Sequence, residues 1–214
     1  MSDGRKSTED LIGQLAEASP PRPFVPSQAL AALIGSILLG VTLWLTLMGF
    51  RHDLATALTS PGTLAKTALP LALMLTALVP AIRLARPDAR IRLWPLTLPI
   101  AIAGTLVLVA ITNGPRGDVL STFLGSTALE CLAVVLLLSA LPIAAGTHLL
   151  RHGASTRPAL SGALIGLAAG AGAAAGYSLA CTEDSPIFYV AWYGAAILLA
   201  TGIGAICGAR FLRW

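Results

Sequence analysis

The side chains of this sequence that are best suited to chemistry are two cysteines with acidic neighbours. Cys131 directly follows Glu130, and Cys181 opens a short segment that also carries Glu183 and Asp184. Thiolates bind soft metal cations and are open to oxidation, and a compartment outside the cytoplasm permits a disulfide. Because the sequence holds no Cys-x-x-Cys pair, spacing alone does not place the two thiols together. Packing, metal binding and redox chemistry all remain open for them.

These side chains must be positioned by membrane-spanning helices. The chain has 214 residues, of which 56% are hydrophobic and only 11% are charged, whereas about a quarter of the residues are charged in typical soluble proteins. A helix needs about 20 apolar residues to cross a bilayer. We predict an all-α fold, a polytopic bundle of six transmembrane helices. The predicted spans are residues 29–50, 64–82, 93–111, 124–146, 159–179 and 188–207.

The lysines and arginines fall unevenly between the two ends of these spans. Eleven belong to the termini and to the loops on their side, whereas only Arg51, Lys66 and Arg116 belong to the other side. Cytoplasmic loops carry the excess of positive charge, so both termini are predicted to face the cytoplasm. The predicted organisation is a cytoplasmic segment, residues 1–28, followed by a transmembrane domain, residues 29–214. Because the basic residues are spread over loops, no direct contact with nucleic acid is expected.

This topology brings the reactive side chains towards the outer face. Cys131 falls in the outer half of its span and Cys181 at an outer end, whereas Cys207 falls near an inner end. Glu130 is the only acid within a predicted span, and a carboxylate inside a bilayer is costly and is a functional candidate by default. The three histidines fall in loops on different sides and predict no shared metal site. The candidate sensor residues are Glu130, Cys131, Cys181, Glu183 and Asp184.

The N-terminal segment has the pattern of a short amphipathic helix. Residues 7–18 place three apolar side chains on one helical face, with acids in the first turn, and a run of prolines then separates them from the first span. The helix itself lacks the basic residues that would favour lipid, so we expect it to dock on a protein partner. The candidate partner-binding residues are Glu9, Asp10, Leu11, Ile12 and Leu15.

Glycines recur at four-residue spacing in the last two spans. Gly162, Gly166 and Gly170 belong to the fifth span, and Gly204 and Gly208 to the sixth. Small residues at this spacing allow two helix backbones to approach closely. We predict that these two spans pack against each other along their glycines.

No enzymatic function is expected. The sequence contains no metalloprotease His-Glu-x-x-His, no Gly-x-Ser-x-Gly and no phosphate-binding loop. A membrane regulator is one interpretation, and a small-solute or ion transporter or channel that uses Glu130 is the alternative. Transporters usually place several polar groups at mid-bilayer, which makes a lone Glu130 a weak signal for transport.

Several motifs resemble those of the NrsF family. They include the opening Thr8-Glu-Asp-Leu-Ile-Gly-Gln-Leu-Ala, the loop Cys181-Thr-Glu-Asp-Ser-Pro-Ile-Phe, the following Trp192-Tyr-Gly and the final Arg210-Phe-Leu-Arg-Trp. The resemblance covers essentially the whole chain. It implies an anti-sigma factor of the bacterial inner membrane that sequesters an extracytoplasmic-function sigma factor and releases it under heavy-metal or oxidative stress in the envelope.

The resemblance also assigns roles to the cysteines. The family carries a cysteine at each of the positions that match Cys131 and Cys181, whereas Cys207 is not part of its pattern. Two chemistries are open for the pair: a soft divalent cation bridging both thiolates with help from Glu130 or Glu183, or an oxidant such as chromate joining them as a disulfide. Beyond such a metal signal, no cofactor is expected.

Overall fold

The computed structural model describes residues 8–17, 24–57, 59–87, 89–113 and 119–212. Every regular element within these ranges is helical, and none of the described residues forms a strand. Among the described residues, six helical segments are long and apolar enough to cross a membrane, which matches the predicted number of spans. In chain order the elements are α1 Thr8–Glu17, α2 Pro26–Met48, α3 Leu54–Ala57, α4 Pro61–Arg83, the 3-10 helix η1 Trp94–Leu96, α5 Thr97–Asn113, α6 Val119–Leu124, α7 Ala128–Leu150, α8 Pro158–Tyr177 and α9 Pro186–Phe211.

The helix α8 forms the centre of the bundle. It packs against α9, α4, α7 and α2, and most of its side chains are buried. Its composition, largely alanine and glycine, explains the position, because only small side chains let four neighbours approach one helix. The predicted close contact with α9 is confirmed: a Cβ atom at Gly162 would collide with the carbonyl oxygen of Gly204, and one at Gly166 with that of Ala200.

The fourth membrane-spanning segment, Ser121–Leu150, contains a helix break that the sequence did not predict. Residues 124–146 were expected to form one helix, but α6 ends at Leu124 and α7 runs over Ala128–Leu150. The break falls at Gly125, whose φ of 53° lies in the left-handed region that glycine tolerates best. A Cβ atom there would also collide with the ring of Phe188. Because both helices are apolar, the hydropathy pattern did not indicate this break.

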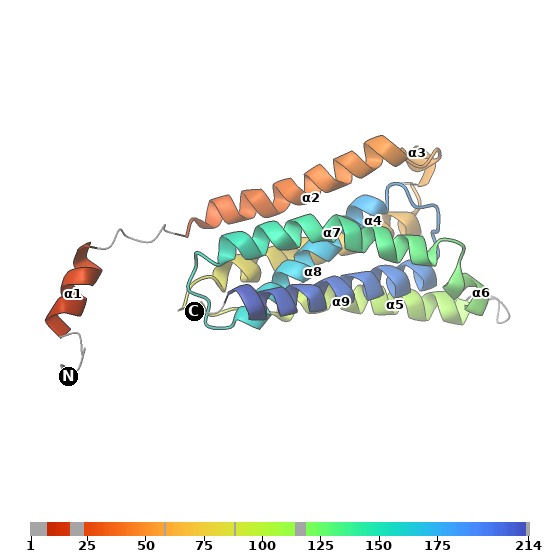
Figure 1. Cartoon of the computed structure of the whole chain (residues 1–214). Coiled ribbons are helices and arrows are strands. Elements are labelled where there is room, and N and C mark those ends of the chain that lie inside the picture. The colour runs from red at the N-terminus through yellow and green to blue at the C-terminus, as the bar shows by residue number, and fades with distance from the viewer. Residues whose placement is uncertain (1–7, 18–23, 58, 88, 114–118, 213–214) are drawn as a thin grey trace.

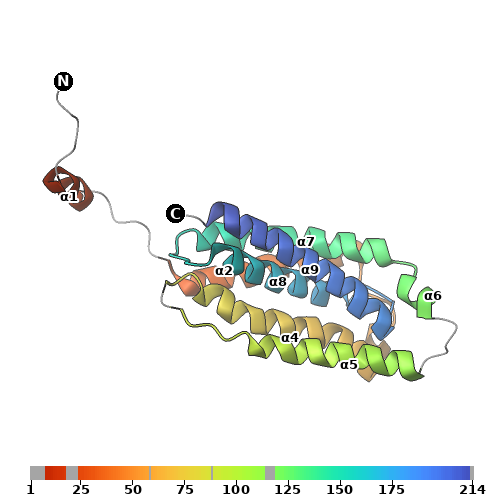
Figure 2. The same ribbon diagram turned by 90° about the horizontal axis from the view of Figure 1, so that it is seen from below.

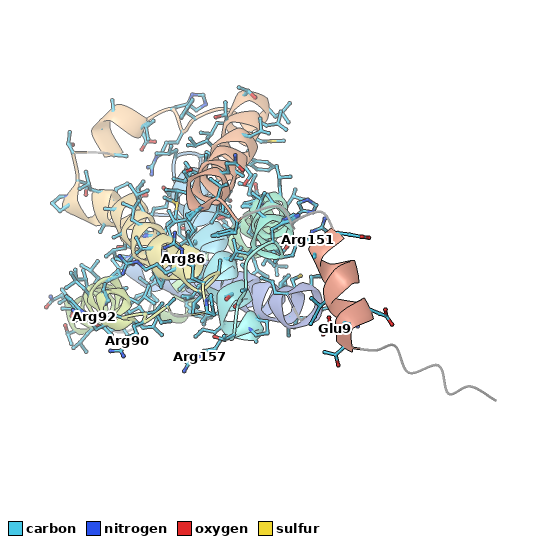
Figure 3. All side chains as sticks on the ribbon, turned by 90° about the vertical axis from the view of Figure 1, so that its left-hand side faces the viewer. Glu9, Arg86, Arg90, Arg92, Arg151 and Arg157 are labelled. Carbon is cyan, nitrogen blue, oxygen red and sulfur yellow. The ribbon has the colours of Figure 1, made fainter. Side chains whose placement is uncertain are left out.

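The two ends of the bundle differ in charge. Figures 1 and 2 show α1 and the end of α9 at the same end of the molecule, while α3 and α6 lie at the opposite end. Figure 3 looks at the first of these ends, where five labelled arginines gather around the helix termini. We call it the arginine-bearing end, and define it by Arg86, Arg90, Arg92, Arg151 and Arg157.

Candidate functional site

Cys131 and Cys181 meet at the end of the bundle that lies opposite to the arginine-bearing end. Cys131 belongs to the first helical turns of α7, and Cys181 follows α8, where its amide donates to the carbonyl of Tyr177 over 3.1 Å. The two thiols lie within hydrogen-bonding reach of each other. Both are buried in the main hydrophobic core, with exposed fractions of 0% and 5%. The structure therefore brings together the two cysteines that the sequence singled out.

Aromatic rings surround this pair. The rings of Tyr177 and Tyr193 pack edge to face with their centroids 6.1 Å apart, and Trp44 packs against Tyr177 at 6.5 Å. The buried hydroxyl group of Tyr193 has no hydrogen-bond partner of standard geometry among the described residues, although it lies close enough to Cys181 to interact with its sulfur. The buried indole N–H of Trp44 also has no hydrogen-bond partner among the described residues, so the aromatic side chains around the thiols include two unsatisfied polar groups.

A cluster of charged side chains borders the thiol pair. The guanidinium of Arg51 binds Asp184 through two hydrogen bonds of 2.7 and 2.8 Å, and Asp53 through two more of 2.7 and 2.8 Å. This fork-like pairing is the strongest form of a carboxylate contact. The pKa of Arg51 is raised, first by its hydrogen bond to Asp184. Partial burial alone would raise the pKa of Asp184, but Arg51 and Lys66 outweigh it and the pKa is lowered.

Lys66 connects this cluster to the cysteine backbone. Its ammonium group is completely buried, donates a hydrogen bond of 2.7 Å to the carbonyl oxygen of Cys181, and lies 3.3 Å from the carboxylate of Asp184. The same carbonyl accepts a second hydrogen bond of 3.3 Å from Arg51. A hydrogen bond from Cys131, together with the charge of Lys66, lowers the pKa of the Cys181 thiol despite its burial. The arrangement favours the thiolate form, which is the reactive form of cysteine.

Glu183 ties the cysteine loop to the start of α7. One of its carboxylate oxygens accepts hydrogen bonds of 3.0 and 2.8 Å from the backbone and the hydroxyl group of Ser126. Nearby, the indole of Trp192 donates to the carbonyl of Phe123 over 2.7 Å. The two contacts lie on either side of Gly125, in the turn that this glycine makes possible. Glu183 is therefore engaged in fixing the turn beside the thiols.

Glu130 lies within the apolar segment Ser121–Leu150, which is long enough to cross a membrane. It was predicted inside the fourth span, where it occupies the first turn of α7 with an exposed side chain. A carboxylate in the first turn of a helix is stabilised by the positive end of the helix dipole, so no mid-bilayer role is needed to explain it.

The comparison with known proteins covers nearly the whole chain. The family described as negative regulator of sigma F, NrsF, matches residues 15–214. This chain belongs to the NrsF family. It is 34% identical to the probable anti-sigma-F factor NrsF of Azospira oryzae over 97% of this chain and 99% of that protein. It is 33% identical to the anti-sigma-F factor NrsF of Caulobacter vibrioides over the same shares of the two chains. No solved structure matches it.

The NrsF family is a family of regulators, and the structure has no obvious metal centre. Within the described ranges no three His, Cys, Asp or Glu side chains are grouped so that they could hold a metal ion. A soft cation at this site would therefore rely on the two thiolates of Cys131 and Cys181. Cys207 lies apart from them, in a groove between α7 and α9 that it shares with His148 and Arg151 of the opposite end.

The predicted partner-binding helix is present in this member of the NrsF family. Thr8–Glu17 forms α1, and the side chains of Glu9, Asp10 and Ile12 are exposed. The side chains of Leu11 and Leu15, which were predicted to complete the apolar face, lie outside the described part of the structure. The helix is thus described, while two of its five candidate contact residues are known from the sequence alone.

Sequence reasoning missed the cations and the tyrosines of the site. Arg51 and Lys66 were treated only as the minority charges of the outer side, and Tyr193 only as part of the Trp192-Tyr-Gly motif. The position of Lys66 near the end of an apolar span gave no clear signal, because a lysine there can extend to the membrane interface instead of pairing inside the protein. The acids that follow Cys181 could have supplied a partner, but no sequence pattern connects residues so far apart.

Proposed function

We propose that this protein is an anti-sigma factor of the bacterial inner membrane that sequesters an extracytoplasmic-function sigma factor. The proposal rests on membership of the NrsF family and on two full-length relatives named as anti-sigma-F factors. The six apolar helices supply the membrane domain. The N-terminal segment, residues 1–28, holds the sigma factor, and residues 29–214 form the sensor.

The proposed orientation places both termini in the cytoplasm. It is supported by the arginine-bearing end, where α1 and the end of α9 lie on the same side of the molecule as five arginines (Figures 1 and 3), because positive charge accumulates on the cytoplasmic side. The thiol pair then faces the envelope and α1 faces the sigma factor. Sensing and binding are therefore assigned to opposite ends of one bundle.

The observation that carries the sensing role is the buried contact between Cys131 and Cys181. Two thiols within hydrogen-bonding reach can respond to two kinds of stress. A soft divalent cation can displace both thiol protons and bind the two sulfurs. Alternatively, an oxidant that accepts two electrons can convert the two thiols into one disulfide, with release of two protons. In both cases heavy-metal or oxidative stress acts on the same pair.

The experiment that tests the proposal is co-purification from native membranes. The full-length protein, tagged at its C-terminus, is captured from unstressed cells and from cells treated with cadmium or with diamide, and co-purifying proteins are identified by mass spectrometry. A sigma factor is expected in the unstressed sample and is expected to be depleted after treatment.

The opposing result would support the transporter interpretation. If no sigma factor co-purifies, and if liposomes containing the protein show solute flux that is lost in Glu130→Gln, the proposal is wrong. The exposed position of Glu130 in the first turn of α7 gives no support to that outcome.

A further inference from the structure

Lys66 is the most unusual residue of the site. Its side chain is completely buried, although Lys66 lies only five residues after Pro61, where α4 starts. Removing an ammonium group from water is expensive unless partners compensate for it. The partners that Lys66 has are the carbonyl oxygen of Cys181 at 2.7 Å and the carboxylate of Asp184 at 3.3 Å. Both belong to the loop that carries the reactive thiol.

The contact of Lys66 with Cys181 is sensitive to the state of the thiol. Metal binding or disulfide formation at Cys181 fixes the sulfur in a new geometry, since a disulfide demands defined distances between the two Cα atoms. The carbonyl of Cys181 is attached to the same Cα atom and moves with it. If it moves away, Lys66 loses its shortest hydrogen bond and becomes a buried charge with a single remaining partner. A chemical change at the Cys181 thiol thereby changes which position of α4 is most stable.

The helix α4 connects Lys66 to the arginine-bearing end. From Lys66 the helix continues to Arg83, and the residues just beyond it dock on the turn between α7 and α8. There the amide of Ala154 donates to the carbonyl of Ala85 over 2.8 Å, and a Cβ atom at Gly153 would lie only 2.7 Å from that oxygen. Arg86 follows directly and lies among the labelled arginines of Figure 3.

Proline gives α4 a place to bend. Pro70 lies inside the helix, one turn after Lys66, and has no N–H to donate to the carbonyl of Lys66. Pro80 interrupts the hydrogen-bond ladder in the same way near the other end. The turn that carries Lys66 is therefore joined to the rest of α4 more loosely than an uninterrupted helix would allow. The contacts of this turn with other elements include those of Lys66 with the Cys181 loop and the hydrogen bond between Thr67 and Ser178.

We infer that Lys66 is a positioning residue that couples the thiol pair to the arginine-bearing end through α4. While both thiols are free, Lys66 holds the Cys181 carbonyl and Asp184, and α4 stays in the arrangement that retains the partner. Loss of this hold shifts α4 towards the releasing arrangement. The inference rests on the proposed function, because the retained partner is the sigma factor. A modification can shift two arrangements only by the difference in their free energies, and Lys66 supplies that difference.

The test compares two neighbouring residues of α4. Lys66→Met removes the ammonium group but keeps an apolar chain of similar length. The matched control is Thr67→Val, which removes the 2.7 Å hydrogen bond between the hydroxyl groups of Thr67 and Ser178 without touching Cys181. Both full-length proteins are captured from unstressed cells at equal membrane abundance, and the sigma factor that co-purifies with each is quantified.

Lys66→Met is expected to retain less sigma factor than the wild type without any stress, by a factor on the order of ten, while Thr67→Val retains it. The same release is expected in Lys66→Met combined with Cys181→Ser, because Lys66 acts downstream of the thiols. If Lys66 served only to activate Cys181, the opposite sign would appear: Lys66→Met would retain the sigma factor and ignore stress, which would overturn the inference.

A charge-balanced variant covers the case in which Lys66→Met does not reach the membrane. Asp184→Asn in the same chain removes one negative charge together with the positive charge of Lys66, so that the net charge of the cluster is unchanged and Arg51 keeps its hydrogen bonds to Asp53. This double variant is also expected to release the sigma factor without stress. Retention by the double variant, or failure of both variants to insert, would show that Lys66 is only a structural residue. If the wild type itself retains no sigma factor, the proposed function fails instead.

Discussion

The thiol of Cys131 in α7 lies within hydrogen-bonding reach of the thiol of Cys181, which follows α8. This contact joins three helices at one point, because α9 begins directly after the Cys181 loop at Pro186. Any bond or metal ion between the two sulfurs therefore acts on the relative position of α7, α8 and α9. The same three helices form the tightly packed centre of the bundle.

An oxidant is expected to link these two cysteines within one chain. Membranes containing the protein are treated with diamide, the remaining thiols are alkylated, and the peptides are identified by mass spectrometry. A disulfide between Cys131 and Cys181 is expected because both sulfurs are already neighbours, while Cys207 should be recovered in alkylated form. Disulfides between two chains, or a linkage that includes Cys207, would contradict the geometry of the site.

The close packing of α8 on α9 should leave no room for a methyl group at the glycines of the contact. Gly166→Ala would place a methyl group against the carbonyl of Ala200, and overpacking of this kind costs about 1–3 kcal/mol. The control Gly202→Ala lies on α9 with no atom within 4 Å of the added carbon, so its stability should be unchanged or slightly higher. Thermal unfolding in detergent measures both. Equal melting temperatures for the two variants would refute the close contact.

The carboxylate of Asp184 should make the stability of the protein depend on pH. Its pKa in the folded protein is lowered below the ordinary value of 3.8, so the folded state binds this proton less tightly than the unfolded state. The stabilisation is therefore complete above pH 4 and is lost as the pH falls below about 4. Asp184→Asn is expected to lower the melting temperature at pH 7 and to reduce its decline in acid. A variant that declines as steeply as the wild type would contradict this role.

The helix α1 should be needed for the partner and dispensable for the bundle. Leu11→Asp combined with Leu15→Asp introduces charges on its predicted apolar face, and loss of the co-purifying sigma factor is expected. Figures 1 and 2 show α1 apart from the bundle, so the melting temperature of the membrane domain should not change. Thr8→Ser, at the start of the same helix, is the control. Normal sigma-factor retention by the charged variant would place the binding surface elsewhere.

Much of the fold follows from one-dimensional patterns. The number of spans, the helix at the N-terminus and the gathering of arginines at one end could be predicted, because hydropathy, helical periodicity and charge bias are properties of local segments. The glycine contact between α8 and α9 was predictable for the same reason, since Gly162 and Gly204 each belong to a run of glycines at four-residue spacing, which indicates close packing.

The candidate site was less accessible to prediction. The break at Gly125 lies against the ring of Phe188, which belongs to another helix, and it places Glu130 in the first turn of α7. Lys66 and Arg51 carry the site's positive charge, but their partner Asp184 is more than a hundred residues away in the chain. Contacts of this kind arise only when the bundle is assembled, so neither the break nor the ion cluster could be read from local composition.

The central claim is that Cys131 and Cys181 act as one sensor, and its most direct test is sigma-factor retention by serine variants under stress. Cys131→Ser, Cys181→Ser and Cys207→Ser proteins are each captured from cells with and without cadmium or diamide. All three are expected to retain the sigma factor in unstressed cells. After treatment, Cys207→Ser should release it as the wild type does, whereas Cys131→Ser and Cys181→Ser should keep it. Release by both of these last two variants would show that the thiols only pack and that the signal enters elsewhere.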